Sequence, residues 1–117
     1  MNFEVLDDFN GLEMAFISKN SGGYISKNKY IFEEIELTPL NQFILEQSVF
    51  GTPIFKLGSG GANILLISGI HGNELPSQAA SLKLLEELIN IDLDNTVYMI
   101  PFAAPKATMN NERTLNS

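Results

Sequence analysis

The sequence predicts an α/β domain in which a β-rich lead-in precedes a right-handed βαβ unit. Three observations carry this prediction. Residues 63–68 form an unbroken apolar run, typical of a parallel strand that is buried on both faces. Residues 76–90 have the apolar spacing of an amphipathic helix. Residues 96–100 form a second strand-like run, and a crossover between parallel strands is almost always right-handed.

The lead-in covers residues 1–61, and its pattern predicts short strands separated by turns. Residues 30–32 and 53–57 are strand-like runs, rich in aromatic and β-branched residues. The clusters Ser21-Gly22-Gly23 and Gly58-Ser59-Gly60-Gly61 are typical of turns. No linker separates this part from residues 62–117, so we expect a single domain over residues 1–117.

Within the βαβ unit, the element boundaries are also marked. Gly69 ends the first strand, and Pro76 suits the first position of a helix. Asn95 leads into the second strand, which Pro101 closes. One face of the helix carries Ala79, Leu82, Leu85 and Ile89, while Lys83 and Glu87 point away.

Composition and charge narrow the classes of function. The 7 basic and 14 acidic residues give a net charge of -7, which repels a phosphate backbone, so we expect no nucleic-acid partner. Without cysteine there is no disulfide or thiolate site, and a metal would have to bind to His, Asp or Glu. The start of the chain lacks a secretory signal, and the strongly apolar run 64–67 is too short to cross a bilayer. We therefore expect a cytoplasmic protein that does not enter the membrane.

The candidate metal-binding residues lie between the first strand and the helix. His71 and Glu74 are separated by two residues, and a turn that runs into a helix can bring such side chains to one point. An imidazole nitrogen and a carboxylate oxygen are both good zinc ligands. Gly69 and Gly72 would let the loop fold tightly around an ion. The position is the carboxyl end of a strand, where α/β sheets usually bind ligands.

Other interpretations of the same residues remain open. His71 could hydrogen-bond the loop, while Glu74 merely complements the positive end of the helix dipole. Ser68 and Ser77 are poor nucleophile candidates, because no Gly-x-Ser-x-Gly elbow surrounds either. The glycines at 58–61 precede a strand rather than a helix, which disfavours a phosphate-binding loop.

The segment Gly69-Ile70-His71-Gly72-Asn73-Glu74 resembles the opening metal motif of the zinc carboxypeptidase superfamily, in its succinylglutamate desuccinylase and aspartoacylase branch. Residues 47–54 look like the lead-in hairpin of that family, and residues 101–113 look like the segment after its next strand. The resemblance therefore implies the N-terminal part of a mixed-sheet zinc-hydrolase fold.

By matching position, the resemblance implies that His71 and Glu74 are the first two zinc ligands. It also implies that Arg113 lies near the scissile carbonyl and stabilises the oxyanion, a role that suits a permanently charged guanidinium. The alternative is that Arg113 is an ordinary surface residue without a role in catalysis. In the family, a second histidine completes the protein ligands and a distant glutamate is the general base.

The chain departs from the family pattern in what it lacks. His71 is its single histidine, and the Asp-x-Asn-Arg motif that the family carries soon after the arginine is not found before Ser117. A catalytic zinc normally has three protein ligands and a water, so we expect the third ligand and the general base to be absent here. The expected domain is therefore a truncated one.

The leading expectation is a zinc-dependent hydrolase of amide bonds that deacylates an N-acyl amino acid. A zinc carboxypeptidase acting on peptides is one alternative. Another is a non-catalytic truncated module or an oligomerising subunit, since an incomplete sheet leaves an edge strand that invites pairing with a second chain. The expected partners are thus a small-molecule or peptide substrate and, for the last reading, further copies of the chain as a homo-oligomer.

Overall fold

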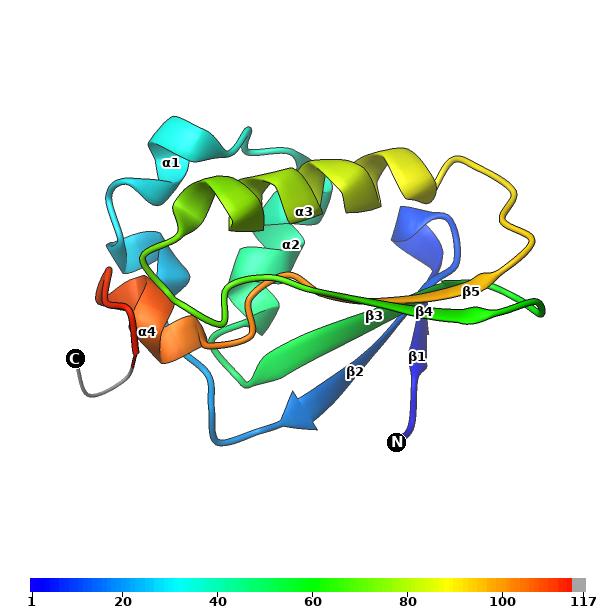
Figure 1. Cartoon of the computed structure of the whole chain (residues 1–117), viewed down its shortest axis with the longest axis horizontal. Coiled ribbons are helices and arrows are strands. Elements are labelled where there is room, and N and C mark those ends of the chain that lie inside the picture. Colours follow the sequence, from blue (N-terminus) through cyan, green and yellow to red (C-terminus); the bar gives the residue numbers. More distant parts are fainter. Residues whose placement is uncertain (115–117) are drawn as a thin grey trace.

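A computed structural model describes residues 1–114, which fold into one mixed sheet with helices packed against it (Figure 1). The elements follow one another as β1 (Glu4–Leu6), η1 (Asp7–Phe9), β2 (Leu12–Ser18), η2 (Ile25–Lys27), α1 (Ile31–Glu34), α2 (Pro39–Gln47), β3 (Thr52–Gly58), β4 (Asn63–Ile67), α3 (Leu75–Leu88), β5 (Thr96–Ile100) and α4 (Pro105–Met109).

The five strands form one sheet in the order β1-β2-β3-β5-β4. The pairs β1·β2, β2·β3 and β3·β5 are antiparallel, whereas β4 and β5 are parallel and joined by α3. The α/β class, the mixed sheet and the βαβ unit are therefore confirmed. Because β3 pairs with β5, the lead-in and the βαβ unit share one sheet. The single-domain interpretation stays a prediction, and its limit at Ser117 lies outside the described residues.

The helices α1, α2 and α3 cover one face of the sheet (Figure 1), and the main core lies between these two layers. Strand residues that point toward the helices include Leu12, Met14, Phe55, Val97 and Met99. The opposite face carries a small cluster of three buried residues, Ala15, Ile54 and Ile100. Over the described part of the chain, the fold is thus a two-layer arrangement with one face of the sheet left largely open.

The prediction that residues 63–68 are buried on both faces is wrong. The strand exists and is parallel to β5, but β4 lies at the edge of the sheet. Leu65 and Ile67 are 55% and 46% exposed on the face that no helix covers, and Ile64 is 40% exposed. An apolar run on both faces predicts burial only if a neighbour covers each face, and within residues 1–114 nothing covers the outer one.

The predicted helix is confirmed as α3, which begins at Leu75, one residue before Pro76. Leu82 and Leu85 are almost completely buried against the sheet, whereas Lys83 is exposed. The apolar spacing therefore identified the correct face of the helix.

The lead-in contains more helix than the sequence predicted. Residues 30–32 are not a strand, because α1 begins at Ile31 and the N–H of Ile35 bonds to the carbonyl oxygen of Ile31 at 3.0 Å. Of this stretch only Ile31 and Ile35 are buried, a spacing of four that is helical. Residues 30–32 have high β-propensity, but this packing overrides it.

The segment that resembled a lead-in hairpin, residues 47–54, connects a helix to a strand instead. Helix α2 ends at Gln47 and β3 begins at Thr52. A start signal for α2 was present in the sequence: Thr38 accepts a hydrogen bond from the N–H of Asn41, and Pro39 opens the helix. The strand predicted at residues 53–57 is confirmed as part of β3.

Candidate metal centre

The loop between β4 and α3, residues 68–74, lies at the carboxyl end of the parallel strands. The N–H of Ser68 bonds to the carbonyl oxygen of Ile100 at 2.9 Å, which extends the β4·β5 pairing by one residue. The chain then turns through Gly69, which has a positive φ of 74°, and enters α3 at Leu75. The loop therefore occupies the position where α/β sheets usually bind ligands.

His71 and Glu74 face one another across this loop. The Nδ1 atom of His71 lies 3.3 Å from Oε1 of Glu74, and the N–H of Glu74 bonds to the carbonyl oxygen of His71 at 3.2 Å. Their side chains are 33% and 63% exposed, so solvent reaches both. The local turn therefore brings together two side chains that the sequence only placed three positions apart.

Glu74 is the N-cap residue of α3, but its carboxylate makes no capping hydrogen bond. A carboxylate whose function is to cap the helix would accept from an N–H of the first turn. Instead Oε1 points to the imidazole of His71. The helix dipole still favours a negative charge here, yet the side chain is oriented toward His71.

Gly72 allows the loop to approach α4 very closely. A Cβ at this position would lie 2.2 Å from the carbonyl carbon of Ala107 and 2.3 Å from the N atom of Thr108. No side chain fits at such distances without movement of the backbone. The glycine is therefore required by packing between the loop and α4.

Arg113 meets the loop through its backbone. The N–H of Gly72 bonds to the carbonyl oxygen of Arg113 at 3.2 Å. The chain turns back after α4 because Asn111 adopts the left-handed conformation, with φ of 53°, which asparagine tolerates better than most residues. The structure thus brings Arg113 beside the His71 loop, with its side chain exposed to solvent.

Sequence analysis missed the buried polar side chains beneath the loop. Gln78 is fully buried, and its Nε2 donates to the carbonyl oxygens of Gly72 at 3.2 Å and Glu74 at 3.0 Å. Thr108 is also fully buried, and its hydroxyl donates to Oε1 of Gln78 at 2.8 Å. A signal was present, because the helical spacing Leu75, Gln78, Leu82, Leu85 places one polar residue within the apolar face.

The two serines are occupied elsewhere. The hydroxyl of Ser77 donates to the carbonyl oxygen of Glu74 at 3.0 Å, and that of Ser68 donates to the carbonyl oxygen of Pro101 at 2.7 Å. Neither hydrogen bond involves His71. A serine nucleophile activated by this histidine therefore finds no support in the geometry.

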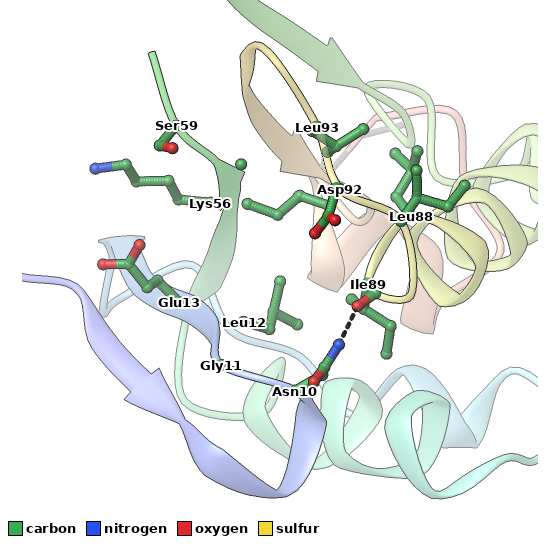
Figure 2. Close-up of a pocket in the computed structure, with 13 residues that line it drawn as sticks. Asn10, Gly11, Leu12, Glu13, Lys56, Ser59, Leu88, Ile89, Asp92 and Leu93 are labelled. Carbon is green, nitrogen blue, oxygen red and sulfur yellow. Dashed lines mark hydrogen bonds between the residues drawn. The ribbon is translucent and has the colours of Figure 1, made fainter.

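A cavity of about 460 Å³ lies at the other end of the sheet, beside the carboxyl end of α3 (Figure 2). Figure 2 shows Lys56, Glu13 and Asp92 around it, together with the bond from Asn10 Nδ2 to the carbonyl oxygen of Ile89. Gly58 pairs with Thr96 at the start of β5, whereas the His71 loop follows the end of β4. This cavity is therefore distant from the candidate chemistry.

Comparison with known proteins adds a family match to this geometry. The family model for the succinylglutamate desuccinylase/aspartoacylase catalytic domain matches residues 60–117. Residues 60–117 are therefore similar to this catalytic domain. Searches of the curated proteins and of the solved structures found no match.

The match with the desuccinylase/aspartoacylase family covers β4, α3, β5, α4 and the loop that holds His71 and Glu74. It supports a hydrolase-like function, and the resemblance noted in the sequence is confirmed. Among residues 1–114 no group of three His, Asp or Glu side chains is arranged to hold a metal ion. Over the same residues, no helix has the length and hydrophobicity that crossing a bilayer requires.

Proposed function

We propose that this protein is a zinc-dependent hydrolase of amide bonds that removes the acyl group from an N-acyl amino acid. The observation that carries the proposal is the 3.3 Å separation of His71 Nδ1 and Glu74 Oε1. These two atoms lie in the segment that matches the desuccinylase/aspartoacylase catalytic domain.

The geometry of this pair fits a shared zinc ion. Two ligand atoms at about 2.0–2.2 Å from one ion, at the tetrahedral angle, lie roughly 3.3–3.5 Å apart. An N–H···O hydrogen bond is usually shorter, at about 2.7–3.2 Å. The separation of 3.3 Å falls in the range for two ligands of one ion, and without an ion it allows a hydrogen bond or, with a protonated imidazole, an ion pair between the same atoms. Both side chains are also partly exposed, so an ion can reach them from solvent.

The third protein ligand has to come from elsewhere. Catalytic zinc sites usually have three protein ligands and an open position, yet among residues 1–114 no third His, Asp or Glu side chain is placed to complete a site with His71 and Glu74. We therefore propose that a residue outside these 117 supplies the third ligand, and that the general base also lies outside them.

Zinc, when bound, supplies a Lewis acid that polarises a carbonyl and lowers the pKa of water. In this proposal His71 and Glu74 hold the ion at the carboxyl end of β4. The guanidinium of Arg113 donates hydrogen bonds to the substrate carbonyl oxygen as negative charge develops on it. The bond between Gly72 and Arg113 supports this arrangement, because it holds the backbone of Arg113 beside the loop that carries His71 and Glu74.

The substrate class follows from the family match rather than from a pocket. An N-acyl amino acid is the proposed substrate because residues 60–117 match a deacylase catalytic domain. A peptide cleaved at its carboxyl end would require the same chemistry at the carbonyl, so carboxypeptidase activity is the alternative within this class. We also propose that the protein acts in the cytoplasm, in keeping with its lack of cysteine.

The proposal is tested with the full-length product of the gene. Purified protein is assayed for release of the free amino acid from N-acetyl and N-succinyl amino acids, and for release of the last residue from peptides. We expect hydrolysis of the acyl amino acids, its loss on treatment with a chelator, and its recovery on addition of zinc. Faster cleavage of peptides would favour the carboxypeptidase. No hydrolysis of either class by zinc-loaded protein would contradict the proposal.

One specific observation favours a second candidate, a non-catalytic module that assembles through its sheet. Within residues 1–114, β4 is an edge strand without charged residues, and Leu65 and Ile67 are exposed on its open face. Such an edge offers unpaired backbone groups and apolar surface to another strand. Self-association of the protein through β4, without zinc binding, would support this candidate as a homo-oligomer.

A further inference from the structure

We infer that Gln78 is a positioning residue for the loop between β4 and α3, residues 68–74, which we call the metal loop. In this role it holds His71 and Glu74 in a zinc-binding arrangement before an ion binds. The inference rests on the proposed function, because it concerns the same two ligands. It differs from that proposal in assigning a role to a buried side chain on α3 whose hydrogen bonds go to two backbone carbonyls of the loop and to the hydroxyl of Thr108.

The burial of Gln78 is unusual, and its buried polar atoms need hydrogen-bond partners. Glutamine is mostly exposed in proteins, yet this side chain is 0% exposed. Its Nε2 donates to the carbonyl oxygens of Gly72 and Glu74, and its Oε1 accepts from the hydroxyl of Thr108. A buried amide that lost these partners would leave polar groups unpaired at considerable cost.

The partners also fix which way the amide points. If the carboxamide were reversed, Oε1 would face two carbonyl oxygens, neither of which can donate a hydrogen bond. In the observed orientation two carbonyls accept from the NH₂ group and one hydroxyl donates to the oxygen. The side chain therefore has one satisfied orientation.

The two accepting carbonyls lie on both sides of Asn73 within the metal motif. One NH₂ group thus holds the backbone at Gly72, next to His71, and at Glu74 itself. Gly69 leaves room for this contact, since a Cβ there would lie 2.8 Å from Oε1 of Gln78. Fixing the backbone of the loop at two points limits the orientations that the His71 and Glu74 side chains can adopt.

Gln78 is in turn anchored to α4 and to the lead-in. Nδ2 of Asn28, which is 3% exposed, donates to the carbonyl oxygen of Thr108 at 2.8 Å. The hydroxyl of Thr108 is also 3.2 Å from the carbonyl oxygen of Ala104, but its contact with Gln78 is shorter at 2.8 Å. The loop is therefore connected by hydrogen bonds to a buried network that spans three parts of the chain.

The test is the zinc affinity of the full-length protein, measured by competition with a chromogenic chelator. Gln78→Met keeps nearly the same volume but removes both donors. Loss of an outer partner of a metal site typically weakens metal binding about 10–100-fold, and we expect a change in that range. Thr108→Val keeps the donors of Gln78 and removes the hydroxyl that orients them, together with its longer contact to Ala104 within α4, so a smaller loss in the same direction is expected. The absorption spectrum of the cobalt-substituted protein should shift in both variants.

A matched control separates positioning from general loss of stability. Leu57→Ala removes buried volume in β3, at the other end of the sheet, and should leave the zinc affinity and the cobalt spectrum unchanged. If Gln78→Met does not fold, Thr108→Val decides the question.

Two outcomes distinguish failure of this inference from failure of the proposed function. If His71→Ala no longer binds zinc but a folded Gln78→Met binds it as tightly as the wild type, the positioning role is overturned. If Gln78→Met does not fold, wild-type zinc affinity in Thr108→Val has the same meaning. Equal zinc binding by the wild type and His71→Ala would instead defeat the proposed metal site, and with it the role of Gln78.

Discussion

The N–H of Gly72 donates a hydrogen bond to the carbonyl oxygen of Arg113, at 3.2 Å. This contact joins the loop that carries His71 to the segment that follows α4. Both residues were singled out from the sequence, but nothing in the sequence indicated that their backbones meet. Gly72 is therefore important for two reasons, since it also lies against Ala107 and Thr108 without room for a side chain.

Gly72→Ala should destabilise the protein and disturb the metal loop. The added Cβ would overlap the backbone of α4, and overpacking of this kind typically costs about 1–3 kcal/mol. Urea unfolding should show this as a lower midpoint with an unchanged slope. Zinc affinity should fall as well.

Gly60→Ala is the control for this change, because a Cβ at Gly60 meets nothing within 4 Å and the residue follows β3 at the other end of the sheet. This variant should lose stability only because alanine is disfavoured at the positive φ of 68°, and it should keep its zinc affinity. If Gly72→Ala unfolds at the same urea concentration as the wild type, the loop and α4 are not packed as described.

Arg113→Met should impair the reaction without releasing zinc. The contact with Gly72 uses the backbone carbonyl, so replacing the exposed side chain should leave the loop in place. Removing one group that stabilises an oxyanion usually lowers kcat about 10²–10³-fold. Steady-state kinetics on an N-acyl amino acid should show this fall in kcat, with zinc content unchanged. Arg113→Lys should restore only part of the rate, because lysine cannot donate two parallel hydrogen bonds.

A substitution on the open face of β4 tests the second candidate function. Leu65 is 55% exposed, so Leu65→Lys should leave the fold intact while adding a charge that disfavours pairing with another strand. We expect the variant to self-associate less than the wild-type chain in sedimentation velocity experiments. Lys83→Ala, on the exposed side of α3, should behave as the wild type does. Equal self-association of Leu65→Lys and the wild type would exclude β4 as the contact.

The sequence predicted the βαβ unit well because local pattern and tertiary structure agree there. Leu82 and Leu85 are buried as their helical spacing indicates. The environment of β4 could not be predicted, since an apolar strand looks alike whether or not a neighbour covers it. Residues 30–32 were misassigned because β-propensity is weaker than the packing of Ile31 and Ile35.

For the candidate site, the sequence identified the residue types but not what supports them. His71 and Glu74 could be chosen from their chemistry and spacing. Gln78 and Thr108 could not, because their hydrogen bonds join α3 to α4 and depend on the folded arrangement. Asn28 lies still farther away in sequence, and its bond to Thr108 has no local signature. The sequence indicated a buried polar side chain only through the position of Gln78 within the apolar face of α3.

The most direct test of the central claim is the zinc content of the full-length protein and of its His71→Ala variant, measured by metal analysis after extensive dialysis. The account predicts about one zinc per molecule in the wild type and almost none in the variant, because a ligand that contacts the ion has been removed. Circular dichroism should show that both proteins are folded. Equal zinc content in the two proteins would contradict the assignment of His71 as a metal ligand.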